Sequence, residues 1–264
     1  NQEFKYDYLI IAAGSRHSYF GNDNWEEYAW GLKTTKDALK IRERMLYSFE
    51  KAERTRSKTK RKKFSTFVVV GAGPTGVEMA GAISEVTQKS ISKDFNQFNS
   101  TESLIYLIEG SDRVLNRYPE SLSNKAKKNL ESMGVIIKLN KVVTNITSDG
   151  VYIGDELIET ENIIWAAGNK ASPLIKSVTN HVTNIGQAEV NLDFSIKESK
   201  NIFCIGDCAF LKDKKGVIVP GVAQGAIQAG KFVANQIIAD QKGLPRKEFS
   251  YFNKGRSRFY KKYH

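Results

Sequence analysis

The sequence is poor in cysteine and has no long apolar run. Its 264 residues include only two cysteines, Cys204 and Cys208, which excludes a scaffold of several disulfides and favours a reducing compartment. No apolar run approaches the roughly 18 residues that a membrane-spanning helix needs. The three histidines lack the spacing of a metal site, and no nucleophile stands in a pattern with a base. The chain opens on Asn1 without an initiator methionine or a signal pattern, so we expect an internal piece of a longer protein.

The net charge of the chain is strongly positive. Forty Lys and Arg residues against 29 Asp and Glu give a formal charge of +11, a balance that invites nucleic acid or an anionic membrane as a partner. Residues 51–63 contain eight basic residues and one acidic residue, and residues 246–264 contain seven and one. The remaining chain is nearly neutral, so the charge does not favour nucleic acid. A solvated charge run is the simpler interpretation of both segments, and an anionic bilayer is the alternative partner.

Strand and helix signals alternate along the chain, which predicts an α/β fold with mainly parallel strands. We expect strands over residues 8–12, 64–70, 104–108, 135–139, 163–165 and 202–205. Helical spacing of apolar residues predicts helices over residues 35–53, 75–88, 121–133 and 222–239. The basic run is expected to be a loop between helices, and residues 89–103 a polar insertion at the surface.

One internal similarity organises the chain. Residues 8–15 and residues 163–169 are both an apolar strand followed by Ala-Ala-Gly and a small polar residue. We interpret them as the two crossings between a domain found at both ends of the chain and a second domain inserted between them. This predicts one domain from residues 1–34 and 169–264, and an inserted domain over residues 35–168.

The sharpest motif is a glycine-rich turn between a strand and a helix. Gly71, Gly73 and Gly76 follow the apolar run 67–70 directly. Such a turn presents unpaired backbone N–H groups and the positive end of a helix dipole to a pyrophosphate. Gly71 permits the tight turn, Gly73 the approach of the phosphates, and Gly76 close packing of helix on strand. The pattern predicts dinucleotide binding.

An acidic residue ends the next predicted strand. Glu109 is placed to accept hydrogen bonds from adenosine ribose hydroxyls and to repel a 2′-phosphate, which favours NADH over NADPH. Arg113 is the evidence against this preference, because a guanidinium near the ribose can accept the phosphate of NADPH. The separation of Gly73 from Glu109 exceeds the usual spacing, and the polar stretch 89–103 accounts for the excess.

Two further segments lie near the C-terminus. Gly206-Asp207 ends a predicted strand and can bring a carboxylate close to ribityl or ribose hydroxyls, although Gly-Asp is also an ordinary turn. The segment 220–230 then turns into a long helix that contains Gln224 and Gln228. These two amides are four residues apart and so share one face.

Taken in order, these segments resemble the type II NADH:quinone oxidoreductases, the single-subunit, non-proton-pumping NADH dehydrogenases. The residues of the resemblance are 6–21, the Gly-Ala-Gly-Pro-Thr-Gly-Val-Glu segment, the Trp-Ala-Ala-Gly crossing, Gly206-Asp207 and Ala-Gln-x-Ala-x-Gln. The resemblance extends from residue 4 to about residue 255. It implies two Rossmann-like domains, one for FAD and one for NADH, and reduction of a quinone at the membrane face.

The resemblance also assigns site residues. NADH would be held by Gly71, Gly73, Gly76 and Glu109, with Glu78 near the nicotinamide and the flavin. FAD would contact Asp207 through its ribityl chain and Ala223 through its ring, with Gly168 at the crossing. Gln224 and Gln228 would line the quinone pocket, where an amide can donate to a quinone carbonyl; the alternative is a pair of solvated glutamines.

Two departures from the family pattern matter. The family begins with its own glycine-rich motif for FAD, and this chain has only one such motif, so we expect an incomplete FAD domain that binds FAD weakly or not at all. Residues 256–264 do not continue the family sequence, and the region that docks on membranes is expected to be absent. In the full-length protein the resemblance implies a peripheral place on the cytoplasmic face of a bacterial inner membrane, or on the mitochondrial inner membrane, and leaves a homodimer open.

Three alternatives remain at this stage. The chain can belong to another flavoprotein reductase with two dinucleotides, of the ferredoxin reductase or NADH oxidase type, or be an inactive NADH-binding fragment. A nucleic-acid-binding module is suggested by the basic run, but no known binding fold supports it. Cys204 and Cys208 flank Gly-Asp and invite a redox interpretation, against which a buried strand position for Cys204 is the simpler one.

Overall fold

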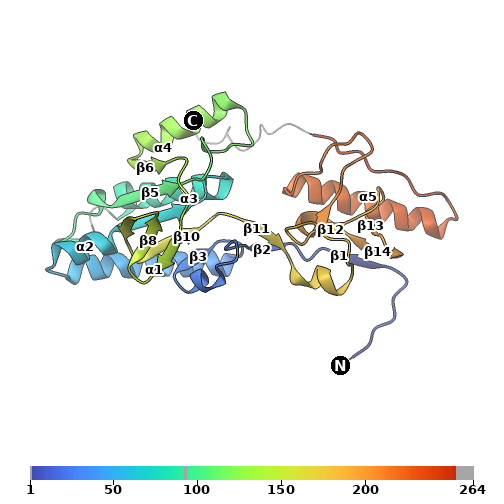
Figure 1. Ribbon diagram of the computed structural model, residues 1–264, viewed down its shortest axis with the longest axis horizontal. Coiled ribbons are helices and arrows are strands. Elements are labelled where there is room, and N and C mark those ends of the chain that lie inside the picture. Colours follow the sequence, from blue (N-terminus) through green and yellow to red (C-terminus); the bar gives the residue numbers. More distant parts are fainter. Residues whose placement is uncertain (1, 92–93, 254–264) are drawn as a thin grey trace. The chain divides into compact units, whose positions relative to one another are not determined.

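The computed structural model describes residues 2–91 and 94–253, and its internal contacts divide the chain into two compact units (Figure 1). Unit 1 contains the residues up to Arg16 and those from Asn169 onward, and unit 2 contains His17–Gly168. Both divisions fall at the ends of the two Ala-Ala-Gly segments. The first division therefore lies after Arg16 rather than after the predicted residue 34, because residues 17–34 pack within unit 2.

Unit 2 is built on a parallel five-stranded sheet with the strand order β3-β10-β4-β5-β6. The strands are β3 (Ala29–Gly31), β4 (Thr66–Val70), β5 (Leu104–Ile108), β6 (Val135–Lys138) and β10 (Asn162–Trp165). One face is covered by α1 (Thr35–Arg54), α3 (Pro74–Glu85) and α4 (Glu120–Ser132). The other face packs against an antiparallel sheet of β7 (Asn145–Thr147), β8 (Gly150–Ile153) and β9 (Glu156–Glu159). The β4-α3-β5-α4-β6 order is that of a dinucleotide-binding unit, as the sequence predicted.

The central strand β4 shows why unit 2 has three layers. Phe67 and Val69 point into the cluster formed with the helices, where Phe67 meets Phe49 of α1 at a ring separation of 5.3 Å. Val68 and Val70 point into the opposite cluster, toward the antiparallel sheet. A strand that is buried on both faces reads as a continuous apolar run, which is what the sequence shows here.

Helix α1 begins where the sequence analysis expected, and its start has a specific cause. Asp37 Oδ2 accepts a hydrogen bond from the backbone N–H of Thr34 over 2.8 Å, and the Thr34 hydroxyl accepts one from the N–H of Asp37. This reciprocal capping box satisfies two N–H groups that the helix cannot pair internally. The predicted helices and strands are confirmed, with ends shifted by at most three residues.

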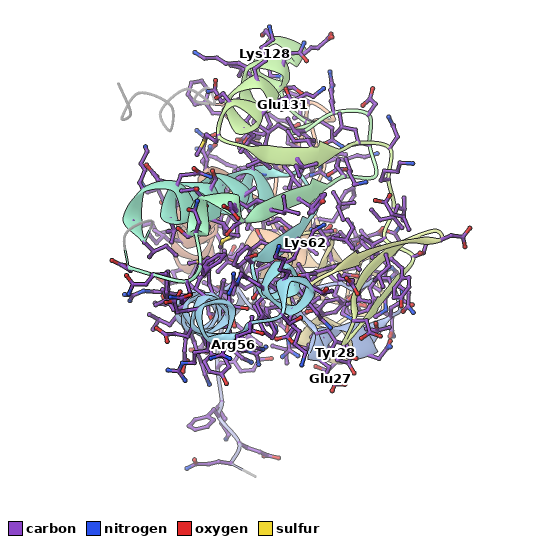
Figure 2. The ribbon with its side chains drawn as sticks, turned by 90° about the vertical axis from the view of Figure 1, so that its left-hand side faces the viewer. Glu27, Tyr28, Arg56, Lys62, Lys128 and Glu131 are labelled. Atoms are coloured by element: carbon purple, nitrogen blue, oxygen red, sulfur yellow. The ribbon has the colours of Figure 1, made fainter. Side chains whose placement is uncertain are left out.

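The basic run 51–63 is not a loop throughout, which corrects the prediction. Residues Lys58–Phe64 form the short helix α2, and β4 begins only at Thr66. Lys51 pairs with Glu161, and Lys63 lies 3.7 Å from a carboxylate oxygen of Asp149. Others, such as Arg56 and Lys62 in Figure 2, are exposed. Apolar periodicity gives no signal for a helix made almost wholly of basic residues, so the sequence does not reveal α2.

The stretch 89–103 is also more than a polar surface insertion. Phe98 is 5% exposed and stacks on Phe49 of α1 at a ring separation of 5.9 Å. Ser100 is buried and donates its hydroxyl to the carbonyl of Thr87 over 2.7 Å. Phe98 therefore belongs to the core formed with the helices, and its polar neighbours in the sequence hide this contribution.

Unit 1 has a small mixed sheet and one long helix. In it, β14 (Ser199–Cys204) pairs in parallel with β1 (Leu9–Ile11) and antiparallel with β13 (Ser195–Ile196). Two further pairs are β12 (Ala188–Glu189) with β15 (Ala209–Phe210), and β11 (Asn169–Ala171) with β2 (Ser15–His17). Between β14 and β15 lies the single turn η5 (Gly206–Cys208), and α5 (Ala223–Gln241) packs on the same core.

The chain after α5 returns over unit 1 and is fixed there at several points. Arg246 lies 2.8 Å from a carboxylate oxygen of Asp193 and also pairs with Asp240. Phe249 is buried and packs edge-on against Phe194 and Phe232. The divergent tail predicted from residue 256 lies outside the described residues. None of the helices within the described ranges combines the length and apolar character that crossing a bilayer requires.

Candidate functional site

The glycine-rich turn after β4 has an opening of the kind a phosphate needs. Gly71 has φ +97°, and a Cβ there would lie 2.8 Å from the backbone nitrogen of Ala167. A Cβ on Gly76 would lie 1.8 Å from the carbonyl oxygen of Gly71. A Cβ on Gly73 would meet no heavy atom within 4 Å. Two of the glycines are therefore required by the protein's own packing, whereas the third faces open space at the start of α3.

Glu109 is joined to this turn by hydrogen bonds. Its Oε2 accepts the backbone N–H of Ala72 over 2.6 Å, and its Oε1 accepts both the N–H and the hydroxyl of Ser111. Two carboxylate oxygens offer about four acceptor positions, so one remains for a ligand hydroxyl. Arg113, the residue that argued for NADPH, donates instead to the carbonyl of Asn116 over 3.0 Å. The negative charge beside the turn is thus fixed in place.

Glu78 lies on α3 two residues beyond the last glycine of the motif. Its side chain is exposed, and no hydrogen-bond partner is found for it among the described residues. It is the one acidic group of α3 near the helix start, since the first turn itself contains none. A free carboxylate here is available to a ligand that enters along the turn.

Gly168 closes unit 2 in a conformation that only glycine adopts easily. Its φ is +67°, and a Cβ would lie 2.7 Å from both the carbonyl oxygen of Ser18 and the ring of Phe20. The carbonyl of Gly168 also accepts the N–H of Ser18 over 3.2 Å. Local packing is sufficient to require glycine here, whether or not a cofactor lies nearby.

Asp207 in unit 1 lies within the turn η5, beside the first crossing. Its Oδ2 accepts the hydroxyl of Ser15 over 2.9 Å, and its backbone carbonyl accepts the amide of Gln187 over 3.0 Å. Gly14 next to Ser15 has φ +65° and would place a Cβ in open space. A carboxylate, a hydroxyl and an open glycine therefore lie together, which suits a ligand with several hydroxyls.

Gln224 and Gln228 share one face of α5, but both amides already have partners. Oε1 of Gln224 accepts the hydroxyl of Tyr251 over 2.6 Å. The amide of Gln228 accepts the backbone N–H of Phe252 over 3.0 Å and donates to its carbonyl over 2.8 Å. Within residues 2–91 and 94–253, no acceptor is found for the amide N–H groups of Gln224, whereas the amide of Gln228 is paired through both its oxygen and its nitrogen. Ala223, the first residue of α5, is exposed.

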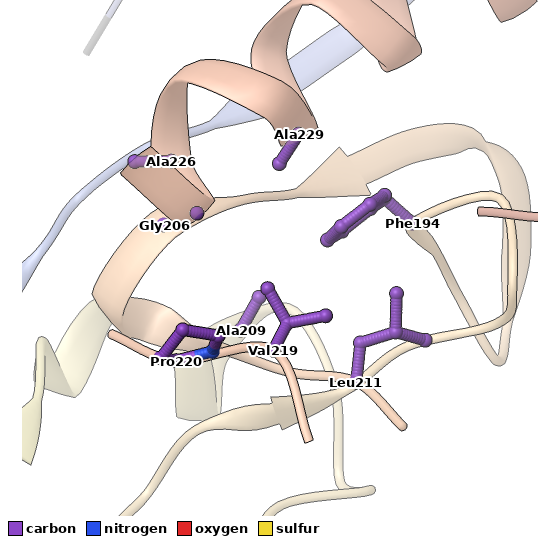
Figure 3. A pocket seen from close by; sticks show the side chains of 9 residues that line it. Phe194, Gly206, Ala209, Leu211, Val219, Pro220, Ala226 and Ala229 are labelled. Atoms are coloured by element: carbon purple, nitrogen blue, oxygen red, sulfur yellow. The ribbon is translucent and has the colours of Figure 1, made fainter. Parts of the chain in front are cut away.

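A small cavity lies beside these residues in unit 1, below the start of α5 (Figure 3). Its volume is about 10 Å³, and apolar residues dominate its wall. The residues that line it are Phe194, Gly206, Ala209, Leu211, Val219, Pro220, Gly225, Ala226 and Ala229. This space suits about one water molecule and no aromatic ring, and neither glutamine lines it.

Sequence reasoning missed three partners of the expected site residues. Ser15 holds Asp207, Gln187 holds its backbone, and Tyr251 orients Gln224. Ser15 follows the first Ala-Ala-Gly, so its place at a crossing was a usable signal. Tyr251 and Gln187 lie far along the chain from their partners, and no local pattern marks them. Within the described residues, no group of three or more His, Cys, Asp or Glu is arranged to hold a metal ion.

Comparison with known proteins agrees with the resemblance seen in the sequence. The chain is 40% identical over 262 residues to the Type II NADH:quinone oxidoreductase Ndh of Mycobacterium tuberculosis, which covers 95% of this chain and 56% of that protein. It is 31% identical to the Type II NADH:quinone oxidoreductase of Haemophilus influenzae, over 95% of this chain and 59% of the relative. The chain thus spans little more than half the length of these relatives.

Solved structures show the same fold. NDH2 from Plasmodium falciparum in complex with NADH matches 79% of this chain and 45% of its own with a TM-score of 0.72 and 26% identity. A ferredoxin reductase from Rhodopseudomonas palustris matches 93% of this chain and 54% of its own with a TM-score of 0.70 and 20% identity, which shows the fold alone. The model of the pyridine nucleotide-disulphide oxidoreductases matches residues 1–230. The chain therefore belongs to the pyridine nucleotide-disulphide oxidoreductase family.

Proposed function

We propose that the protein containing this chain is a flavin-dependent NADH dehydrogenase that reduces a quinone. The observation on which this rests is the 40% identity to a type II NADH:quinone oxidoreductase over 95% of the chain, which includes both the glycine-rich turn and the helix with Gln224 and Gln228. Fold similarity alone does not distinguish this activity from that of other flavoprotein reductases. The site residues supply the more specific support.

NADH would bind at the turn after β4 in unit 2. The pyrophosphate would lie against Gly73, where a side chain would project into open space, and on the N-terminus of α3. Glu109 would accept one ribose hydroxyl with its remaining position, and its charge would repel a 2′-phosphate. Glu78, exposed and unpaired within the described residues, would lie toward the nicotinamide.

FAD would be held in unit 1, in part by Asp207 and Ala223. Asp207 and Ser15 offer a carboxylate and a hydroxyl to the ribityl chain, and Gly14 leaves room beside them. Gly168 at the second crossing is a further proposed contact. Bound flavin supplies the two-electron chemistry between nicotinamide and quinone, so the protein has to position and to polarise rather than to exchange protons.

A quinone carbonyl would be met by Gln224. Because Tyr251 occupies Oε1 of this residue, its amide N–H groups remain for an acceptor. Gln228 would contribute by holding the adjoining backbone of Phe252 in place. We place the full-length protein at the surface of a bacterial or mitochondrial inner membrane, where quinones reside, and a homodimer is its proposed assembly.

The test uses the intact protein that contains this chain, loaded with FAD. We expect NADH to reduce the flavin and a short-chain quinone to reoxidise it in repeated turnovers, with NADPH much less effective. If oxygen or a ferredoxin reoxidises the flavin and a quinone does not, the quinone reductase assignment is wrong. The protein is then a flavoprotein reductase of the NADH oxidase or ferredoxin reductase type. Binding of NADH to the 264-residue chain, followed by fluorescence, tests the unit 2 site separately from turnover.

A further inference from the structure

The two cysteines of the chain touch each other inside unit 1. Cys204 is the last residue of β14 and Cys208 the last residue of η5, and both side chains are fully buried. Their sulfur atoms lie 3.4 Å apart. A disulfide bond is about 2.05 Å long, so the two sulfurs have to approach each other by about 1.4 Å to form one. The sequence contains no other cysteine that could compete for either partner.

The surroundings make the two sulfurs chemically unequal. The two sulfurs share a hydrogen bond in which either one can be the donor. With Cys204 as the donor, this hydrogen bond lowers the pKa of Cys208 to about 6, against the effect of burial. The backbone N–H groups of Gly14 and Ala13 act in the same direction. The same interaction raises the pKa of Cys204 well above its ordinary value. The lower pKa favours Cys208 over Cys204 as the nucleophile of the pair.

We propose that Cys204 and Cys208 form a reversible dithiol–disulfide site that is oxidised by a hydroperoxide. The thiolate of Cys208 attacks one peroxide oxygen; an S–O bond forms, the O–O bond breaks, and the departing oxygen takes up a proton from solvent and leaves as water or an alcohol. The sulfur of Cys204 then attacks the resulting sulfenic acid. An S–S bond forms, the S–O bond breaks, and the hydroxyl leaves as water with the proton of Cys204. Two thiols lose two electrons, and the peroxide gains them.

The position of the two cysteines determines which oxidants can reach them and which neighbouring residue their oxidation affects. Because both sulfurs are buried, oxidation needs a small oxidant and a transient opening of the three-residue turn η5. The disulfide ties this turn to the end of β14. Asp207 lies inside the bridged segment and accepts the hydroxyl of Ser15. Oxidation of the two cysteines therefore constrains the backbone around Asp207, whose carboxylate we assign to flavin binding. Formation of the disulfide itself does not depend on that proposed role of Asp207.

The test uses the whole 264-residue chain, reduced and then exposed to hydrogen peroxide at neutral pH. We expect the intact mass to fall by about 2 Da, the weight of the two hydrogens lost, and both thiols to disappear from a titration in denaturant. A dithiol reductant should restore both. A folded chain that keeps its two thiols while the urea-unfolded chain loses them would overturn the proposal. So would addition of oxygen to the folded chain without the loss of 2 Da.

Matched single variants test whether Cys208 is more reactive toward the peroxide than Cys204. Cys204→Ser keeps a hydrogen-bond donor toward Cys208 but cannot form the bridge, so Cys208 should accumulate as a sulfenic acid that dimedone traps. Cys208→Ser should leave Cys204 as an unreactive thiol with no adduct. Equal labelling of the two variants would contradict the proposed roles. Circular dichroism checks that both serine variants keep the fold, and Cys208→Ala replaces Cys208→Ser if the buried serine destabilises it.

Discussion

The hydroxyl of Tyr251 donates a hydrogen bond to Oε1 of Gln224 over 2.6 Å. This contact joins the segment that follows α5 to the first turn of the same helix. The next residue, Phe252, exchanges two backbone hydrogen bonds with the amide of Gln228. The two glutamines of the proposed quinone site therefore differ: Tyr251 orients the amide of Gln224, while Gln228 holds the segment.

Removal of the Tyr251 hydroxyl should weaken quinone binding in the intact protein. Tyr251→Phe leaves the ring in place but frees the Gln224 amide to rotate, and loss of one such hydrogen bond costs about 0.5–1.5 kcal/mol. We expect the KM for a short-chain quinone to rise about threefold to tenfold, with the Kd for NADH unchanged. Tyr47→Phe, an exposed tyrosine of α1, is the matched control. Identical quinone kinetics in the two variants would remove Tyr251 from the site.

Gln228→Ala should release the segment after α5. In the 264-residue chain the backbone N–H of Phe252 loses its acceptor, so its peptide should exchange hydrogen for deuterium at least about tenfold faster. Gln224→Ala leaves that N–H paired and serves as the control. In the intact protein, quinone reduction that is unchanged by Gln228→Ala would show that the assignment of this residue to the quinone site is wrong.

Alanine at two positions of the glycine-rich turn should separate folding from NADH binding. Gly73→Ala places its Cβ in open space, so the free energy of unfolding should change by no more than about 1 kcal/mol while NADH affinity falls more than tenfold. Gly76→Ala drives its Cβ into the carbonyl of Gly71 and should destabilise the chain by about 1–3 kcal/mol or more. Urea unfolding and NADH titration measure both. Retention of NADH binding by Gly73→Ala would exclude the pyrophosphate from this turn.

The regular elements of the fold could be predicted from the sequence because their signals are local. The five buried residues of β4 and the capping pair Thr34 and Asp37 mark their elements without reference to distant residues. Helix α2 could not be predicted in this way, because its basic residues give no apolar period and Lys63 finds its partner in the distant Asp149. Polar contacts between distant residues have no local signature.

The same distinction applies to the candidate site. Gly71, Gly73 and Gly76 are visible in the sequence because a backbone turn fixes their spacing. The contact of Ser15 with Asp207 and that of Tyr251 with Gln224 depend on segments brought together only by folding. The unequal state of Cys204 and Cys208 likewise follows from burial and from the direction of one hydrogen bond, neither of which spacing reveals.

Asp213 should make the stability of unit 1 sensitive to acid. Burial opposes its ionisation, but the N–H groups of Tyr251, Val217 and Lys215 outweigh burial and lower its pKa below the ordinary 3.8. A carboxyl with a lowered folded-state pKa stabilises the fold fully above its unfolded value, and this stabilisation is lost as the pH falls through the folded-state pKa. The free energy of unfolding should therefore begin to drop as the pH approaches 3.8 and should drop further below that value.

Urea titrations at several pH values check this dependence. Asp213→Asn should be less stable at neutral pH and should lose less stability on acidification, since the neutral amide cannot titrate. Asp155→Asn, at an exposed position, is the control and should follow the wild-type curve. Parallel pH curves for Asp213→Asn and the wild type would show that the stability lost in acid comes from other carboxyls.

Glu109→Gln should shift the preference between NADH and NADPH. The carboxylate is held beside the turn by Ala72 and Ser111, and a glutamine oxygen can still accept from either one. The variant removes the negative charge that a 2′-phosphate would meet, and about 1.4 kcal/mol of relieved repulsion corresponds to a tenfold change. We expect the ratio of the NADPH to the NADH dissociation constant to fall about tenfold, as measured by fluorescence titration of the 264-residue chain. Glu102→Gln, an exposed acid before β5, should leave the ratio unchanged. If Glu109→Gln also leaves this ratio of dissociation constants unchanged, the adenosine ribose does not bind beside Glu109.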